Sequence, residues 1–469
     1  MEENRNKFAE NKMGVNKFAE NKMGVMPVSK LVFNMSVPIM ASMLVQALYN
    51  VVDSIFVSRI SENALTAVSL AFPMQALMIA VSTGTAVGIN ALLSRALGAR
   101  DPERAEKVAL NGVFLAALSF IAFILIGILV SPVFFRSQTD VEEIVDSGIT
   151  YLTICSCVSF GLFFGITFER LLQSTGRTLY TMFTQGLGAI INIILDPILI
   201  FGFFGMPRMG VAGAAAATVI GQICGMCLSL FFCLTKNPEV PLNFKGFRPS
   251  GEIVRDIYLI GVPSIIMQAI GSVMVYGVNR ILIPFTTTAA TVFGAYFKLQ
   301  SFIFMPVFGL NNGVIPIVAY NYGARKKSRI MQAFKVSLTT AACIMVVGTL
   351  VFQLVPNWLL ALFDASDEML SIGEPALRII SLSFPMAAVG IVCSGVFQAL
   401  GNSFLSMFVS LARQLVLLLP IAWLLSLSGE LGMVWWAFPI AEVVSLMLSI
   451  AFFRWTYRRH IAPLADARS

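Results

Sequence analysis

The chain has 469 residues, of which 57% are hydrophobic and 12% charged, and its formal net charge is +7. Its mean hydropathy of +0.82 is far above that of soluble domains, so the composition excludes a soluble globular protein and indicates an integral membrane protein. The basic excess requires no nucleic-acid partner, because the membrane topology predicted below accounts for it.

The chain begins with a tandem decapeptide, NKFAENKMGV, at 6–15 and again at 16–25. This stretch is polar and too poor in apolar residues to order itself, so we predict a disordered tail over residues 1–28. A basic membrane-surface anchor is the alternative, and the glutamates within each copy weaken it.

Apolar runs long enough to cross a bilayer as helices follow the tail. They lack the period-two alternation of barrel strands. We predict an all-α polytopic membrane protein with twelve transmembrane helices at about 30–58, 64–94, 108–135, 147–172, 179–204, 210–235, 253–285, 289–320, 333–363, 370–400, 404–427 and 431–456.

Lys and Arg concentrate on one side of these predicted spans. That side holds the N-terminal tail, the GARDPERAEK and GARKKSR loops, residues 236–252 and the end of the chain, whereas the other side holds acidic loops such as TDVEEIVD. Because short cytoplasmic loops keep positive charge during insertion, we predict that both termini are cytoplasmic.

The two halves of the chain repeat each other at an offset of 225 residues. The first-half residues Ala64, Thr66, Phe72, Gln75, Gly84, Gly88, Gly98, Ala99, Arg100 and Arg104 match Ala289, Thr291, Phe297, Gln300, Gly309, Gly313, Gly323, Ala324, Arg325 and Arg329. Each copy contains six helices, so both enter the membrane in the same direction, and a pseudo-twofold axis along the membrane normal should relate them.

The repeat predicts the domain organisation. Two six-helix lobes, 29–235 and 253–458, are joined by a cytoplasmic linker, 236–252, and followed by a cytoplasmic tail, 459–469. Halves of this kind usually enclose a cavity.

A polar stripe runs along the first predicted helix, where Ser42, Gln46, Asn50 and Asp53 are spaced by four, four and three residues. An ionisable group in the bilayer costs several kcal/mol unless it faces protein or water, so Asp53 is a functional candidate. A purely structural hydrogen bond between helices is the alternative. Gln46 and Asn50 are candidates for lining the cavity.

A second polar pair, Asn192 and Asp196, lies on one face of the fifth predicted helix and is followed by Pro197. The missing N–H of the proline frees a carbonyl one turn back, so a bend should coincide with the polar site. Asp53 and Asp196 lie at about the same depth, roughly 11 Å from the outer ends of their helices. We expect one site in the outer half of the first lobe.

The second lobe differs at the equivalent positions, where Val278, Leu417 and Ile421 replace the polar residues. It carries intramembrane cations instead, Lys298 and Arg413, which lie deep in their predicted spans and need a partner or water. Two interpretations stay open: these cations line the cavity, or they stabilise the lobe.

Several segments resemble the MATE family of multidrug and toxic compound extrusion transporters, in particular its bacterial branch. The resemblance covers nearly the whole chain after residue 26 and rests on VPIMASMLVQALYNVVDSIFVSRI, on the LLQSTGRT and FQALGNS repeats, on NIILDPILIF followed by GVAGAAAAT, and on FIFMPVFGLNNGVIPIVAYNYGAR.

The resemblance implies two helical bundles that form a V, alternating access, and efflux of organic cations driven by inward Na⁺ or H⁺. Asp53 resembles the family's first-helix acid and Asn192 with Asp196 its fifth-helix pair, and Thr218 completes this cation-coupling cluster. Family members with an acidic second lobe also carry carboxylates in that bundle; these are absent here, so we expect no coupling site in the second lobe.

We therefore predict a secondary active multidrug exporter of the bacterial inner membrane, with cationic drugs or dyes as substrates. No enzymatic activity and no cofactor beyond the coupling ion, H⁺ or Na⁺, is expected, and we expect a monomer. The chain has no GxxxxGK[ST] segment, which argues against nucleotide-driven transport. The alternative is a flippase for lipid-linked saccharides or other lipids, which Lys298 and Arg413 keep open.

Overall fold

The computed structural model describes residues 21–363 and 365–464, and these ranges contain helices, turns and loops but no strand. The elements of the first half are α2 (Lys22–Val25), α3 (Val28–Ser58), α4 (Glu62–Gly98), α5 (Pro102–Gln138), α6 (Glu142–Cys157), α7 (Phe160–Ser174), α8 (Thr178–Phe201), η1 (Phe203–Gly205) and α9 (Val211–Lys236). Those of the second half are α10 (Gly251–Leu282), α11 (Thr287–Gly323), α12 (Lys327–Leu354), α13 (Pro356–Ala361), α14 (Asp367–Ser381), α15 (Phe384–Ala399), α16 (Ser403–Leu411), η2 (Ala412–Leu418), α17 (Leu419–Ser426), α18 (Leu431–Val434), α19 (Ala437–Thr456) and η3 (Tyr457–Ile461).

Within the described ranges, ten helical segments are long and apolar enough to span a membrane, and two bent helix pairs raise the number to twelve. The bent pairs are α6 with α7, at 42°, and α14 with α15, at 48°. The predicted all-α fold with twelve spans is therefore confirmed, but the helices predicted at 147–172 and 370–400 are each broken. The helical ladder tightens at both breaks, where Ser159 N bonds Ser156 O and Ser383 N bonds Ile380 O.

Two further helices differ from their predicted forms. The helix predicted to reach residue 363 ends at Leu354, because Pro356 begins a separate short helix and disfavours a helical backbone in the residue before it. The span predicted at 404–427 contains a π-helical stretch, η2, which widens the helix around Arg413.

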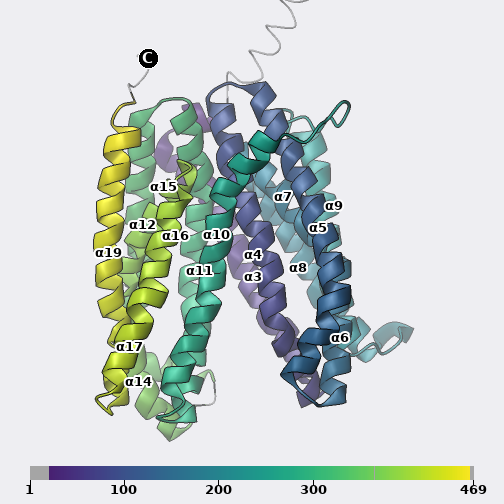
Figure 1. The fold of residues 1–469 in the computed structure, drawn as a ribbon, viewed down its shortest axis with the longest axis vertical. Helices are drawn as coiled ribbons and strands as arrows, with labels where there is room; N and C mark the ends of the chain where they lie inside the picture. The colour runs from purple at the N-terminus through teal and green to yellow at the C-terminus, as the bar shows by residue number, and fades with distance from the viewer. Residues whose placement is uncertain (1–20, 364, 465–469) are drawn as a thin grey trace, which may run out of the picture.

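The helices form two lobes, α3–α9 and α10–α19, which pack together at one end of the molecule and diverge toward the other (Figure 1). Both ends of the described chain lie at the end of the molecule where the lobes pack together (Figure 1); Met23 O accepts a hydrogen bond from Arg329 there, and Ala462 O accepts one from Lys327. We call this the terminal end and the other the open end.

The internal repeat is visible in the backbone. Arg100 and Arg325, which are 225 residues apart, both have a left-handed backbone, with φ of 58° and 55°. Gly176 and Gly401 form a second pair at this spacing, with φ of 84° and 83°. A left-handed conformation is costly for arginine, so its recurrence at equivalent positions indicates that both lobes use the same connection between helices.

Glycines allow the lobes to approach closely at the terminal end. A Cβ on Gly88 of α4 would lie 2.3 Å from Ile257 O of α10, and one on Gly98 would lie 1.9 Å from Tyr320 O of α11. Their repeat partners Gly313 and Gly323 pack against α3 and α4 in the same way. The repeated glycines therefore form the contact between the lobes.

The tail differs from its prediction. Residues 1–20, which include the first decapeptide, lie outside the described residues. Residues 21–27, predicted to be disordered, are packed against the terminal end, and Met23 has no exposed surface. The prediction was wrong here because it considered composition alone and could not see the groups that this segment contacts.

Candidate functional site

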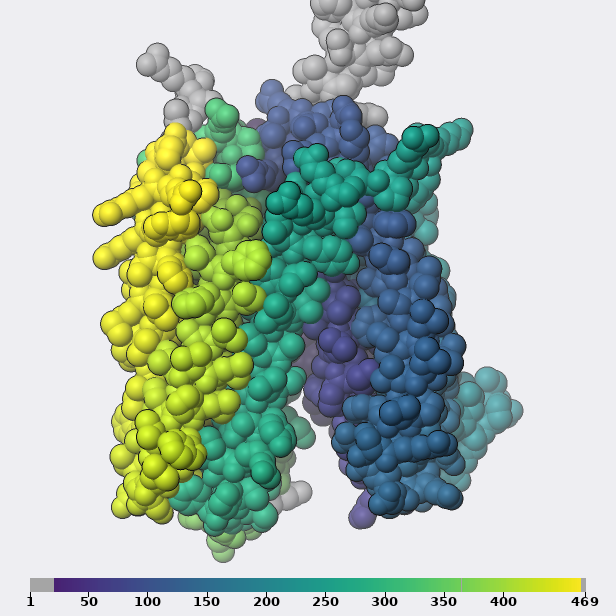
Figure 2. Space-filling model, viewed as in Figure 1, coloured from purple at the N-terminus to yellow at the C-terminus, as the bar shows by residue number. Residues whose placement is uncertain are grey.

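A cleft separates the two lobes at the open end (Figure 2). Its walls include the parts of α3, α4, α10 and α11 that lie beyond the lobe contact. Thr83 of α4 and Gln268 of α10 bond each other across the lobes near the middle of their helices, with Gln268 Nε2 to Thr83 Oγ1 at 2.7 Å. From this contact toward the open end the lobes move apart (Figure 1).

The polar stripe of α3 extends along this diverging part. Ser42 is buried and donates to Pro38 O at 2.9 Å, whereas Gln46 and Asn50 are exposed and Asp53 is half-buried. The stripe therefore has a structural member at its terminal end and three accessible or partly accessible members toward the open end.

Pro38 does not break α3, although it cannot donate to the carbonyl of Asn34. The hydroxyl of Thr178, at the start of α8, donates to that carbonyl at 3.4 Å. Because proline removes one hydrogen bond of the helix, α3 can bend at this point if the contact with Thr178 is lost.

The α8 pair lies in the interior of the first lobe. Asn192 is 3% exposed and Asp196 is fully buried. Asn192 Nδ2 donates to Thr218 Oγ1 of α9 at 3.3 Å. Gly221 makes this possible, because a Cβ there would lie 2.6 Å from Gly188 O and hold the two helices apart.

Asp53 and Asp196 lie near each other where α3 packs against α8, close enough for the charge of one carboxylate to affect the other. Among the described residues, none donates a hydrogen bond to either carboxylate oxygen of Asp196, to Asp53 Oδ1 or to Asn192 Oδ1, although all four atoms are buried. Pro197, within α8, has no N–H to donate to the carbonyl of Ile193 in the same turn. Unpaired buried oxygens are costly, so this donor set suits either a hard cation such as Na⁺ or a proton.

Sequence reasoning missed the residues that surround Asp53. Tyr151 and Cys155 of α6 lie close to it, as does Tyr49 of α3. Gln75 Nε2 donates to Tyr151 Oη at 3.2 Å and approaches Cys155 Sγ at 3.7 Å. A tyrosine inside an apolar run was the available signal, because its hydroxyl needs a partner when buried.

Lys298 is exposed on α11. It shares a helical face with Phe302, Met305 and Gly309, at spacings of four, three and four residues. Because Gly309 packs against Met40 of α3, this face is turned to the first lobe, and Lys298 lies about 16 Å further toward the open end. Lys298 therefore lies on the face of α11 that continues from the lobe contact toward the open end.

Arg413 has a partner that the sequence analysis overlooked. Its Nη1 lies 3.4 Å from Oε2 of Glu442, a buried residue of α19. The Arg413 side chain is 28% exposed, compared with 9% for Glu442. The structure thus favours the second interpretation for Arg413, stabilisation of the lobe.

We expect Glu442→Gln to destabilise the protein by roughly 2 kcal/mol, less than for a fully buried pair because Arg413 retains some exposure. The change leaves the guanidinium without its counter-charge in an apolar lobe. Thermal unfolding in detergent measures the effect, and the double variant Arg413→Gln/Glu442→Gln should recover much of the loss. Equal stability of wild type and Glu442→Gln would show that the pair contributes nothing.

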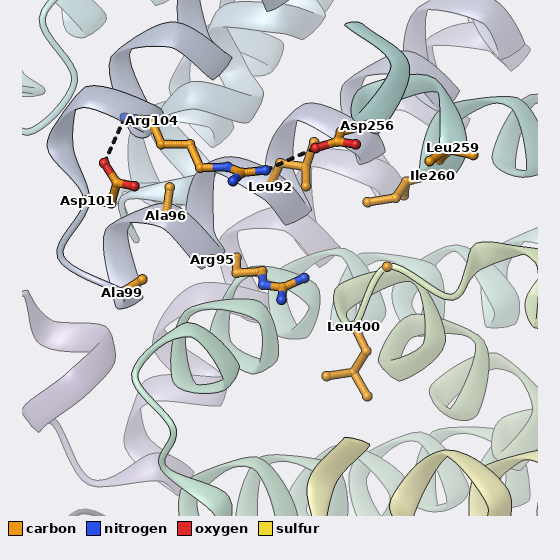
Figure 3. Close-up of a pocket in the computed structure, with 11 residues that line it drawn as sticks. Leu92, Arg95, Ala96, Ala99, Asp101, Arg104, Asp256, Leu259, Ile260 and Leu400 are labelled. Atoms are coloured by element: carbon orange, nitrogen blue, oxygen red, sulfur yellow. Dashed lines mark hydrogen bonds and ion pairs between the residues drawn. The ribbon is translucent and has the colours of Figure 1, made fainter. Parts of the chain in front are cut away.

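A separate pocket of about 360 Å³ lies at the terminal end and contains none of the predicted site residues (Figure 3). Arg104 of the first lobe and Asp256 of the second form an ion pair at 3.0 Å along its edge. This pocket is therefore part of the lobe contact rather than of the cleft.

Two six-helix lobes around a cleft that opens at one end, with the buried carboxylate of Asp196 inside one lobe accepting no hydrogen bond from the described residues, define a two-lobe membrane transporter. The chain belongs to the MatE family, whose model matches residues 38–198 and 260–424. The two matched ranges lie at nearly the repeat offset found in the sequence.

Curated relatives extend this assignment. Multidrug export protein MepA of Staphylococcus haemolyticus (strain JCSC1435) is 26% identical over 434 residues, which cover 90% of this chain and 92% of that protein. The protein of the same name from Staphylococcus aureus (strain MW2) is 24% identical over 424 residues, which cover 89% and 91%.

Solved structures agree with the fold. A crystal structure of MATE in complex with MaL6 has a TM-score of 0.88 at 25% identity and covers 93% of this chain and 98% of its own. An outward-facing conformation of a multidrug resistance MATE family transporter has a TM-score of 0.86 at 26% identity, with the same coverage. A MOP superfamily transporter from Pyrococcus furiosus, described as having a binding pocket of reverse polarity, has a TM-score of 0.87 at 25% identity and covers 93% and 97%.

Proposed function

We propose that this chain is a cation-coupled antiporter of a bacterial cell membrane that exports lipophilic organic cations in exchange for Na⁺ or H⁺. The observation that carries the proposal is the buried carboxylate of Asp196 near Asp53: both oxygens of Asp196 lack hydrogen-bond donors among the described residues. The names of the Staphylococcus relatives support drugs as the substrate class.

The proposal includes an orientation. The basic loops of the sequence fall at the terminal end, so this end is cytoplasmic and the cleft opens outward. The likeness to a structure described as outward-facing supports the same assignment.

In this proposal, the negative charges of Asp53 and Asp196 couple ion binding to transport. Two carboxylates in a poorly solvated pocket repel each other, and a bound cation or proton removes that repulsion. The relief can favour a first helix bent at Pro38, which narrows the cleft and releases the drug outward. Gln46, Asn50 and Lys298 are the cleft residues that we assign to substrate contact.

The alternative function, a lipid flippase, requires free cations in the cleft to bind phosphate groups. Arg413 is engaged by Glu442, which leaves Lys298 as the cation predicted for that role. The P. furiosus structure, described as suggesting a different function, gives a reason to test this possibility.

We expect the purified protein in proteoliposomes to move ethidium-type dyes when a Na⁺ or a proton gradient is imposed, each gradient being tested separately. Expression in a pump-deficient bacterium should likewise lower accumulation of such dyes. If several dyes accumulate unchanged despite confirmed membrane insertion, multidrug export is the wrong function. A change in lipid-linked precursor flipping in the same cells would favour the flippase.

A further inference from the structure

The segment Asn21–Met26, which we call the clasp, lies at the junction of the two lobes. Its short helix α2 is capped by Asn21, whose Oδ1 accepts from Met23 N at 2.9 Å. Met23 has no exposed surface, and a Cβ on Gly24 would lie 3.1 Å from the ring of Tyr320. The clasp is thus a short folded peptide that packs closely against the residues around it, and we call the site that these residues form the groove.

The second lobe holds the clasp through its backbone carbonyls. Arg329 Nη2 donates to Met23 O at 3.0 Å and to Met26 O at 2.7 Å. Lys326 Nζ donates to Gly24 O at 2.9 Å. Carbonyls at the C-terminus of a helix have no partner within the helix, and cations are their favoured partners. These three hydrogen bonds recognise the backbone conformation of the clasp and involve none of its side chains.

The first lobe and the linker hold its other side. Asn21 Nδ2 donates to Oε2 of Glu239 at 2.6 Å, and Oε1 of Glu239 pairs with Arg177 at 3.2 Å. Gly176, with φ of 84°, lies against Lys22. Burial, followed by the charge of Arg177, lowers the pKa of Lys22, while Glu239 opposes the shift, as expected for a side chain enclosed by the groove.

We propose that the clasp is a peptide ligand of this groove which holds the two lobes together at the terminal end and must leave the groove when that end opens. Separation of the lobes would pull Arg329 and Lys326 away from Glu239 and Gly176, so the clasp cannot keep both sets of contacts. The inference rests on alternating access, which is part of the proposed function.

The sequence supplies a second ligand for the same groove. The clasp begins with NKMGV, and an identical NKMGV lies at 11–15, outside the described residues. If the first copy took the place of the clasp, the chain between residue 15 and the start of α3 would have to close a loop, and a loop of this length carries a modest entropic cost. Since the first copy has the same five residues, it offers the groove the same backbone carbonyls and the same Asn, Lys and Met side chains as the clasp.

Because NKMGV occurs twice, the test must alter each copy separately. Deleting 6–15 or deleting 16–25 produces the same chain, so either deletion leaves one clasp, and we expect full transport from it. Met23→Asp inserts a charge into a fully buried position and should expel the second copy. Its matched control is Met13→Asp, the same change in the first copy.

The measurement is the rate at which a maleimide modifies a cysteine placed at Ser36, a buried residue whose hydroxyl donates to Leu310 O of the other lobe at 3.3 Å. The full chain, with its seven cysteines replaced, is used in lipid nanodiscs. No drug or ion gradient is involved, so the result is independent of whether the dye-transport assay succeeds.

We expect slow labelling in the parent chain, in the chain lacking 6–15 and in Met13→Asp. Met23→Asp in the chain lacking 6–15 should label about tenfold faster, since its one clasp is damaged. In the full-length chain the same substitution should have a small effect, because the first copy takes over. Arg329→Gln damages the groove itself and should accelerate labelling whether one copy is present or two.

If Arg329→Gln and Met23→Asp in the shortened chain are both labelled as slowly as the parent chain, the clasp does not hold the lobes together. If Met23→Asp is labelled equally fast in the full-length and the shortened chain, the first copy does not replace the clasp. Dye efflux measured separately on the parent chain tests the proposed function, so the two failures are distinguishable.

Discussion

Replacing Asp53 by Asn is expected to stop gradient-driven dye efflux while leaving the protein folded. Asparagine keeps the size of the side chain but imitates the permanently neutral form, so the site can no longer exchange a cation or a proton. Because Asp53 is half-buried and Asp53 Oδ1 accepts no hydrogen bond from the described residues, removing its charge should cost little stability. Drug binding should persist.

Asp196→Asn should have the same effect, and the double variant should be no worse than either single one. Residues that act as one coupled unit are not additive, whereas independent contributions would multiply. Dye efflux from proteoliposomes measures the loss, and dye binding to detergent-solubilised protein shows that the cleft is intact.

Two controls test whether the loss of efflux is specific to the Asp53 and Asp196 site or follows from any change in the number of acidic groups. Asp256→Asn removes an acid that pairs with Arg104 at the partly exposed edge of the lobe contact, where such pairs contribute about 0–1 kcal/mol, and should retain efflux. Val278→Asp places an acid at the repeat-equivalent point of the second lobe and should not rescue Asp53→Asn. Val278 is fully buried, which adds a stability cost to this second control. Efflux near the wild-type level in Asp53→Asn would exclude this coupling mechanism.

The first-lobe site was accessible to sequence reasoning because helix geometry relates its members. Asn192 and Asp196 are one turn apart, and equal depth in the membrane brought Asp53 and Asp196 to the same level. The structure places these two carboxylates near each other and Asn192 against Thr218. Helical periodicity was therefore sufficient to predict which polar residues of neighbouring helices lie close together.

Other features depend on contacts that periodicity cannot supply. Glu442 contradicts the expectation that the second lobe lacks carboxylates; its partner Arg413 lies 29 residues away in another helical segment, and the pattern along one helix does not reveal such a pair. The clasp is held by residues 218 to 306 positions away, so its polar composition gave no sign of order. The breaks near Ser159 and Ser383 arise from local tightening of the helix, which an apolar pattern does not record.

The second large effect is expected at the lobe contact, from Gly88→Ala. The added Cβ would lie 2.3 Å from Ile257 O and 3.1 Å from Ile257 C, and these are backbone atoms that cannot turn aside. Alanine favours a helix over glycine by about 1 kcal/mol, so α4 itself should gain stability. The clash can be relieved if α4 and α10 separate, which opens the terminal end.

Overpacking of this kind costs about 1–3 kcal/mol, and 2 kcal/mol changes the ratio of two conformations about 30-fold. We therefore expect Gly88→Ala to lower dye efflux at least tenfold and to accelerate maleimide labelling at Ser36→Cys, while thermal stability changes little. Gly186→Ala is the matched control, since Gly186 also lies within a helix but its Cβ would meet no atom within 4 Å. The control should transport normally. Wild-type efflux and labelling in Gly88→Ala would mean that the lobes tolerate the extra methyl group at their contact, and that the close approach of α4 to α10 does not set the balance between the two states.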